Sequence, residues 1–223
     1  MGYLSFNLQI QDKHIVIIGG GSVAQRKAVT ILPAGARLTV ISPTITFELQ
    51  KLRDSGAIEH IHREYTPGDL AGAFMAIAAT NSKAVNLAVA QEANRLGMLV
   101  EITDNPTMGN VTSPALVRQG DLSIAISTNN RAPALSAVIR KELTEVFGPE
   151  YAQTVRVLGA VREKLLTDEG GSTYNKQVLR ELAEQLPPLF ASGAGTEIDA
   201  LLQRRLGPGY TLASIEPALE DPK

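Results

Sequence analysis

The stretch His14-Ile-Val-Ile-Ile-Gly-Gly-Gly-Ser-Val-Ala-Gln-Arg-Lys27 decides the fold of this chain. Four apolar residues lead into three glycines, and helix-compatible residues follow. This order predicts a buried strand that turns directly into a helix with a bare N-terminus. Such a helix end carries unpaired N–H groups and the positive pole of the helix dipole, so it binds phosphate groups.

The small residues in this turn have the spacing G-x-G-x-x-A, which makes a dinucleotide the first hypothesis. Gly19 suits the tight turn, Gly21 lets the backbone approach a pyrophosphate, and Ala24 lets the helix pack close to the strand. Similar turns also bind flavins and S-adenosylmethionine. An acid about 20 residues further on would bind the ribose hydroxyls. The second predicted strand ends in Ser42-Pro43 instead, and Arg37 lies earlier on it, so NAD and NADP are not distinguished.

Composition excludes several classes of protein. A net charge of −2 over 223 residues argues against a general nucleic-acid binder. The absence of cysteine excludes disulfides, thiolate catalysis and Cys-ligated metals. His60 and His62 have no evident third ligand, so no metal site is expected. No apolar run approaches the ~20 residues that span a bilayer, and the N-terminus does not read as a secretory signal. We therefore expect a cytoplasmic protein without membrane contact.

Strand and helix patterns alternate through the first half of the chain. The predicted strands are His14–Ile18, Arg37–Ile41, Ile58–Ile61, Phe74–Ala78 and Leu99–Ile102, and the predicted helices are Ser22–Leu32, Thr44–Ser55 and Ser82–Leu96. This alternation predicts an α/β fold of Rossmann type, with helices on both faces of a parallel sheet. Right-handed crossovers then place the strand C-termini at one edge, where ligands bind.

The pattern changes after about residue 110. We predict a strand at Leu122–Ser127 and a helix at Ala134–Phe147, which together form a small α+β segment. An all-α part follows, with helices at Tyr151–Leu166, Thr173–Leu186 and Thr196–Leu206 that end at glycine or at Pro187-Pro188. Residues 208–223 are expected to be a loosely held tail.

Polar residues follow the predicted strands at the ligand-binding edge: the glycine turn, Ser42-Pro43, Thr80-Asn81 and Thr103-Asp104-Asn105-Pro106. Asp104 has two interpretations. It either starts an ordinary Asp-Asn-Pro turn or serves as a general base near the nicotinamide end of a dinucleotide. Arg118 and Arg131, with Arg26, Lys27, Arg140 and Lys141, are singly typical of surface charges but together suit a ligand rich in carboxylates.

The chain also resembles a known family. Gly19–Lys27 looks like the Gly-Gly-Gly-x-Val-Ala-x-Arg-Lys signature of precorrin-2 dehydrogenases, which are single enzymes or the N-terminal part of siroheme synthases. The similarity continues through Arg63-Glu-Tyr65, Asp69-Leu70, Ala78-Ala-Thr-Asn81, Val85-Asn86, Asp104-x-Pro106, Pro114 and Leu122–Thr128. It covers about residues 1–150, and no diagnostic match follows them.

The resemblance implies NAD-dependent oxidation of precorrin-2 to sirohydrochlorin by a homodimer. It implies an NAD-binding Rossmann domain at residues 1–112, a dimerisation segment at 113–149 and a helical domain at 150–223. In the family the aspartate at the position of Asp104 is the essential carboxylate. Some members also insert iron, whereas others leave that step to a separate chelatase.

From the residues and the resemblance together we expect three groups at the site. Gly19, Gly21, Ser22, Val23, Ser42, Pro43, Thr80 and Asn81 bind NAD, Asp104 is the base, and Ser127, Thr128, Arg118 and Arg131 line the tetrapyrrole. A bifunctional dehydrogenase and ferrochelatase remains an alternative, and so does a non-catalytic nucleotide-sensing module.

The chain departs from the family pattern beside the expected substrate. Where the family often has Ser-x-Gly-Gly-x-Ser-Pro, this chain has Ser127-Thr-Asn-Asn-Arg-Ala-Pro133. Asparagine still tolerates positive φ, so the turn is expected to survive the loss of both glycines. Ala132, however, lacks the second hydroxyl.

Overall fold

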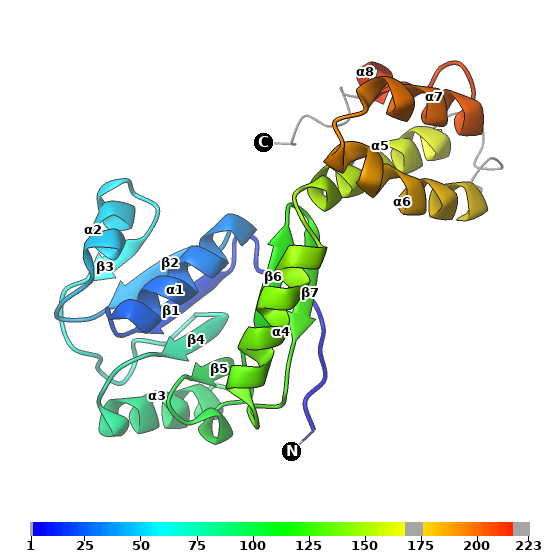
Figure 1. Cartoon of the computed structure of the whole chain (residues 1–223). Coiled ribbons are helices and arrows are strands. Elements are labelled where there is room, and N and C mark those ends of the chain that lie inside the picture. The colour runs from blue at the N-terminus through cyan, green and yellow to red at the C-terminus, as the bar shows by residue number, and fades with distance from the viewer. Residues whose placement is uncertain (1, 168–175, 216–223) are drawn as a thin grey trace. The chain divides into compact units, whose positions relative to one another are not determined.

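A parallel sheet of five strands organises the first half of the chain (Figure 1). Its strands are β1 (His14–Ile18), β2 (Arg37–Ile41), β3 (Glu59–Ile61), β4 (Met75–Ala78) and β5 (Leu99–Ile102), in the spatial order β3-β2-β1-β4-β5. The computed structural model describes residues 2–167 and 176–215. The chain forms two compact units, Met1–Ser113 (unit 1) and Pro114–Lys223 (unit 2).

Helices cover both faces of the sheet in unit 1. They are α1 (Ser22–Ile31), α2 (Phe47–Asp54) and α3 (Lys83–Arg95), with short 3₁₀ helices η1 (Leu32–Ala34) and η2 (Pro106–Met108). Ala24 and Ala28 of α1 and Leu49 of α2 pack in one apolar cluster, while Val89 and Ala93 of α3 pack in the other. The predicted α/β fold of Rossmann type is therefore confirmed.

Strand β1 is buried from its second residue onward, because helices cover both of its faces. Ile15 and Ile17 are 0% exposed and face the α1 side, and Val16 and Ile18 face the α3 side. Burying one such side chain stabilises a fold by about 1.5–3 kcal/mol. The continuous apolar run is thus what a central parallel strand requires.

Unit 2 begins with an antiparallel hairpin of β6 (Ala115–Gln119) and β7 (Leu122–Ile126), against which α4 (Pro133–Val146) packs. Strand β6 was absent from the sequence prediction. Its signal was Gly120-Asp121 between two short runs, which is a typical two-residue hairpin turn. Gly120 has φ +56°, and Gln119 pairs with Leu122 across the turn.

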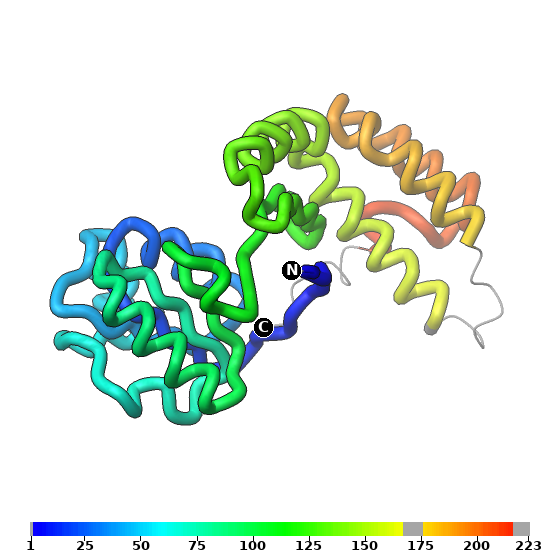
Figure 2. Tube along the Cα trace, turned by 90° about the horizontal axis from the view of Figure 1, so that it is seen from below, coloured from blue at the N-terminus to red at the C-terminus, as the bar shows by residue number. Residues whose placement is uncertain are grey.

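The other described elements of unit 2 are helices, as predicted. It contains α5 (Glu150–Thr167), α6 (Lys176–Ala191), α7 (Gly195–Leu206) and α8 (Leu212–Ile215). Figure 2 shows α6 and α7 next to each other, and Leu182, Leu186 and Leu202 from these two helices lie in one buried cluster.

One predicted helix boundary in unit 2 is wrong. Pro187 and Pro188 were expected to end a helix, but both lie inside α6. Proline removes a backbone N–H and crowds the preceding turn. Pro187 is buried beside Leu182 and Leu186, and we attribute the continued helix to this burial. The predicted helix start at 173–175 lies outside the described residues.

The expected loose tail is also wrong for residues 208–215. Tyr210 is 8% exposed and Ile215 is 2% exposed, and both belong to the cluster formed by α5, α6 and α7. The Leu212 N–H donates to Asp199 at 2.7 Å, which ties α8 to α7. The remaining expected tail, residues 216–223, lies outside the described residues. No helix in residues 2–167 or 176–215 combines the length and apolar character needed to cross a bilayer.

Candidate functional site

The carboxyl ends of β1, β2, β4 and β5 meet at one edge of the sheet in unit 1. The residues that follow these strands are held there by backbone hydrogen bonds. Gly19 N–H donates to Ile41 O at 2.9 Å, and Thr103 N–H donates to Ala78 O at 3.0 Å. The segments that carry the predicted cofactor residues and Asp104 are therefore neighbours in space.

The glycine turn after β1 is packed so closely that side chains are excluded from it. Gly19 has φ +111°, and a Cβ there would overlap the carbonyl oxygen of Ala79. A Cβ on Gly20 would overlap the carbonyl oxygen of Thr44. Sequence analysis did not single out Gly20, because its requirement comes from a loop more than twenty positions away. Gly21, in contrast, is exposed and faces open space.

The N-terminus of α1 differs from those of α2 and α3. Thr46 caps α2 by accepting from Leu49 N–H, and Ser82 caps α3 by accepting from Val85 N–H. At α1 the N-cap is Gly21, and no side chain in the described part of the protein caps it. The first turn of α1 also lacks an acidic residue. These free N–H groups fit an anionic ligand such as a pyrophosphate.

Ser42, at the end of β2, has its hydroxyl engaged within its own loop. It donates to the Thr44 carbonyl at 2.7 Å, and its carbonyl oxygen lies 2.9 Å from His60 Nε2. Pro43 is exposed beside it. Arg37 is the first residue of β2, at the opposite end from the glycine turn. Neither an acid nor a cation therefore stands at the end of β2 to choose between NAD and NADP.

Asp104 is exposed just beyond β5, and a buried amide from α3 holds it. Asn86 Nδ2 donates to Asp104 Oδ1 at 2.8 Å and to the Thr80 carbonyl at 3.1 Å. The Thr80 hydroxyl donates to Asn86 Oδ1 at 2.7 Å. The structure thus brings together Thr80 and Asp104, two of the predicted site residues, through a third residue to which no role was assigned.

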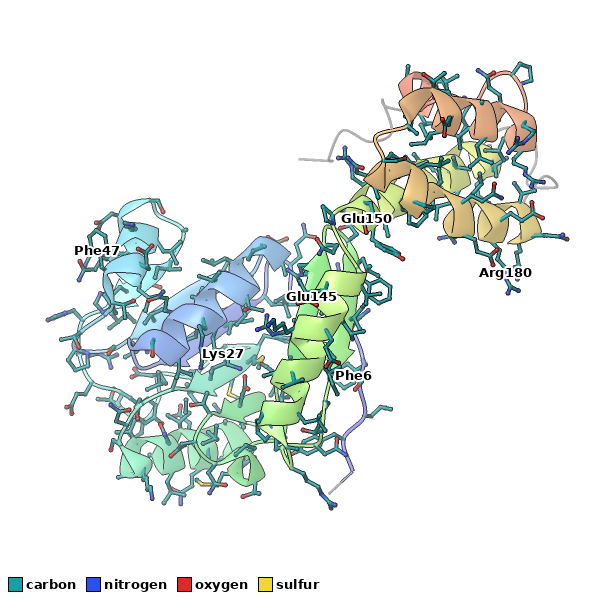
Figure 3. All side chains as sticks on the ribbon, viewed as in Figure 1. Phe6, Lys27, Phe47, Glu145, Glu150 and Arg180 are labelled. Carbon is teal, nitrogen blue, oxygen red and sulfur yellow. The ribbon has the colours of Figure 1, made fainter. Side chains whose placement is uncertain are left out.

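Lys27, which ends the glycine signature, makes an ion pair within unit 1. Its Nζ lies 2.7 Å from both carboxylate oxygens of Glu101 on β5, and Figure 3 labels it on α1. Ser113 completes this site by donating its N–H at 3.1 Å and its hydroxyl at 2.8 Å to Glu101. Lys27 therefore fastens α1 to β5, which accounts for a cation that sequence reasoning had grouped with ligand-binding charges.

The other motif residues of unit 1 brace the loop between β3 and β4. Arg63 forms a two-pronged ion pair with Asp69, which lowers the pKa of that carboxyl below its ordinary value. Burial raises the pKa of the Tyr65 hydroxyl, and the hydrogen bond that it donates to Glu92 adds to this effect. Glu92 also accepts from Gly68 N–H at 3.0 Å. We assign these motif residues to loop architecture.

The predicted substrate residues lie in unit 2, where Arg118 and Arg131 are exposed. The hydroxyls of the neighbouring turn have internal partners. Ser127 Oγ accepts from Asn129 N–H at 3.1 Å, and Thr128 Oγ1 accepts from Ala132 N–H at 3.2 Å.

The backbone of this turn is left-handed, as expected from its two asparagines. Asn129 has φ +52° and Asn130 has φ +61°. Asparagine is among the residues that tolerate this region, so the turn keeps its shape without glycine.

Two family models match the chain in succession. Residues 6–115 match the family described as "Putative NAD(P)-binding", and residues 119–145 match "Sirohaem biosynthesis protein central". The parallel sheet of unit 1 and the uncapped N-terminus of α1 agree with the first description.

Curated relatives are siroheme synthases. One from Aeromonas salmonicida (strain A449) is 34% identical over 195 residues, which cover 86% of this chain and 42% of the relative. One from Stutzerimonas stutzeri (strain A1501) is 38% identical over 153 residues, covering 69% and 33%. One from Pseudomonas paraeruginosa (strain DSM 24068 / PA7) is 33% identical over 214 residues, covering 94% and 45%. The chain spans less than half the length of these relatives.

A solved structure titled "SirC, precorrin-2 dehydrogenase" shares the fold. Its TM-score is 0.72 at 24% sequence identity, and the match covers 98% of both chains. At this identity the likeness shows a common fold.

Proposed function

We propose that this chain is a siroheme-biosynthesis enzyme that oxidises precorrin-2 to sirohydrochlorin with NAD⁺ as the hydride acceptor. One observation carries the proposal. The uncapped N-terminus of α1 lies at the same sheet edge as the Asp104 carboxylate, so a phosphate-binding end and a candidate base occur together. A dinucleotide oxidoreductase needs both.

The cofactor residues take roles that suit their positions. Gly19, Gly21, Ser22 and Val23 contact the pyrophosphate through backbone groups, since the α1 end offers free N–H donors. Ser42 and Pro43 lie on the adenosine side, and Thr80 and Asn81 lie on the side of the nicotinamide ribose. NAD⁺ bound in this way supplies the acceptor for a hydride from the macrocycle.

Asp104 accepts the proton that is lost as the macrocycle gains conjugation. The reaction removes two hydrogens from precorrin-2, one as hydride and one as a proton. NAD⁺ accepts the hydride, and a single carboxylate is enough to accept the proton. Asp104 is exposed and fixed at Oδ1 by Asn86, which leaves the carboxylate accessible to a substrate at the sheet edge. Positioning alone supplies much of the rate in such a reaction.

Arg118 and Arg131 in unit 2 bind carboxylate arms of the tetrapyrrole, and Ser127 and Thr128 line the same side. Both arginines are exposed cations, and arginine pairs well with carboxylates. We retain the division into a Rossmann domain at residues 1–112, a dimerisation segment at 113–149 and a helical domain at 150–223. The compartment is proposed to be the cytoplasm.

The active form is proposed to be a homodimer formed through residues 113–149. Helix α4 supports this, because Leu135, Val138 and Val146 are 52%, 54% and 61% exposed although all three are large and apolar. Apolar side chains on one helix are a common feature of an interface between subunits. A Val138→Glu variant that kept the oligomeric mass of the parent in light scattering would argue against α4 as the contact.

The decisive experiment mixes the protein with precorrin-2 and either NAD⁺ or NADP⁺ and follows the NADH and sirohydrochlorin absorbance bands. The proposal predicts that both bands rise together at equal molar rates. Nucleotide binding without any rise would indicate a nucleotide-sensing module instead. Iron insertion into sirohydrochlorin without NAD⁺, measured in parallel, would add the ferrochelatase activity.

A further inference from the structure

Asn86 has no role in the assignment above, although it lies at the centre of the candidate site. It belongs to the first turn of α3 and is 1% exposed. Its amide makes contacts on both sides: Oδ1 faces the Thr80 hydroxyl, and Nδ2 faces the Thr80 carbonyl and Asp104 Oδ1. A buried polar group with all of these partners is costly to misplace, so its geometry is well defined.

The orientation of this amide follows from its neighbours. Both groups near Nδ2, the Thr80 carbonyl and the Asp104 carboxylate, accept hydrogen bonds and cannot donate one when Asp104 is ionised. Turning the amide over would place its oxygen against two acceptors. The Thr80 hydroxyl accepts from Ser82 N–H at 3.1 Å and has two acceptors for its own proton, Asn86 Oδ1 at 2.7 Å and the Ser82 carbonyl at 3.2 Å. The shorter distance favours Asn86 Oδ1.

We infer that Asn86 is a positioning residue that aims the Asp104 carboxylate. By holding Oδ1 at 2.8 Å, it restricts rotation of an otherwise exposed side chain and leaves Oδ2 as the oxygen that takes the proton. No hydrogen bond involves Asp104 Oδ2 within residues 2–167 and 176–215. This inference rests on the proposed function for its kinetic consequence, whereas the contact itself does not.

The Asn86 contacts also connect the segment assigned to the nicotinamide ribose with the candidate base. Thr80 lies in the segment assigned to the nicotinamide ribose, and its hydroxyl and carbonyl both contact the amide that holds Asp104. A displacement of the Thr80 segment would therefore reach the base through a single residue. A small misplacement of a reacting group costs about 100-fold in rate.

The kinetic test compares Asn86→Ala with Asn110→Ala. Asn110 is the control, because its side-chain amide makes hydrogen bonds in unit 1 away from Asp104: Oδ1 accepts from Val100 N–H at 2.8 Å, and Nδ2 donates to the Met98 carbonyl at 2.9 Å. We expect Asn86→Ala to lower kcat by about 10- to 100-fold, with the Kd for NAD⁺ and the KM for precorrin-2 changed less than about threefold. Asn110→Ala should also lower the melting temperature, by less because Asn110 is exposed, and should keep its kcat.

A purely structural role predicts a different result. It would make kcat follow the folded fraction in both variants, or leave it unchanged in Asn86→Ala, and either outcome overturns the inference. If Asn86→Ala does not fold, the contact is tested by NMR in the ligand-free protein. The side-chain amide signals of Asn86 should move in Asp104→Ala, which removes only an exposed side chain.

The two proposals fail separately. Unchanged Asn86 amide signals in Asp104→Ala would overturn the positioning role whatever the enzyme does. A wild-type protein that binds NAD⁺ but oxidises no precorrin-2 would overturn the proposed function. A shift of the Asn86 amide signals in Asp104→Ala would still establish the contact between the two side chains.

Discussion

Helices α1 and α3 begin at the same edge of the sheet, directly after the adjacent strands β1 and β4, yet their first turns are built differently. At α3, Ser82 caps the helix and Asn86 is bonded to Thr80 and Asp104. At α1, the N-cap Gly21 has no side chain, and the described residues provide no other cap. Stability alone would favour a cap at both ends, since each contributes about 1 kcal/mol.

The difference indicates a division of labour between neighbouring helix ends. Under the proposed function the donors of α1 bind a ligand, whereas the polar groups of α3 hold the protein's own side chains in place. An uncapped end that is also free of acidic residues is a ready anion site. Three substitutions and one control test this division, and a fourth substitution outside the two helix ends sets the lower limit of effect.

Asp104→Ala should have the largest effect, because it removes the group that the α3 end holds. We expect kcat to fall by about 10²- to 10⁴-fold, the usual contribution of a general base. Binding of NAD⁺, measured by calorimetry, should be retained, since α1 is untouched. Turnover at the parent rate would show that the α3 end serves no catalytic purpose.

Gly21→Asp should abolish the contrast by giving α1 the cap that it lacks. A Cβ at this position meets no atom within 4 Å, and φ is −82°, so the fold accepts the change. A carboxylate beside the pyrophosphate should weaken NAD⁺ binding at least about tenfold through like-charge repulsion. The ligand-free protein should melt at the parent temperature or slightly above it, because aspartate is a good N-cap.

The control for Gly21→Asp is Val29→Glu, which adds the same charge to an exposed position later in α1. It should leave NAD⁺ affinity within about twofold of the parent, because helix-end effects fall off within one turn. Equal losses in both variants would mean that net charge, not the helix end, controls binding.

Thr46→Ala removes the cap of α2, where no ligand is proposed. The free energy of unfolding should fall by about 0.5–1 kcal/mol, near the lower end for cap removal, because the Leu49 N–H to Thr46 Oγ1 distance is long at 3.4 Å. Chemical denaturation measures this loss. NAD⁺ affinity that fell together with stability would indicate that α2 contributes to the site.

Arg63→Gln should have the smallest effect, because this ion pair lies on an exposed loop. Arg63 holds the pKa of Asp69 below 3.8, so the pair stabilises the folded state above that pH, and the contribution is lost as pH falls through the lower folded value. The stability difference between parent and variant should therefore be present at pH 7 and vanish in strong acid. A difference that grew on acidification would contradict this.

Unit 1 was predicted more closely than unit 2, for physical reasons. Strands β1, β2 and β5 begin and end at the predicted residues, because a buried parallel strand is a continuous apolar run bounded by turn residues. In unit 2, β6 was missed because it ends in the polar residues Arg118 and Gln119, and Pro187 was taken as a helix end. Local sequence shows what proline costs a helix, but not the burial that offsets it.

The candidate site shows the same limit. Gly19 and Gly21 were recognised because their backbone geometry is a local property. Asn86 was part of a recognised motif but had no assigned role, since its function depends on Asp104, 18 positions away. Lys27 was grouped with cations that could bind a carboxylate-rich ligand, because its partner Glu101 is 74 positions away.

The sequence by itself determined the order of strands and helices in unit 1, the glycine start of α1 and the family resemblance, because periodicity and glycine act over a few neighbouring residues. Only the tertiary structure decided which polar groups meet. It joined Thr80, Asn86 and Asp104 at one sheet edge and Lys27 to Glu101 across another pair of elements. Hydrogen bonds and ion pairs depend on distances in space that parallel crossovers create, and no local pattern encodes those distances.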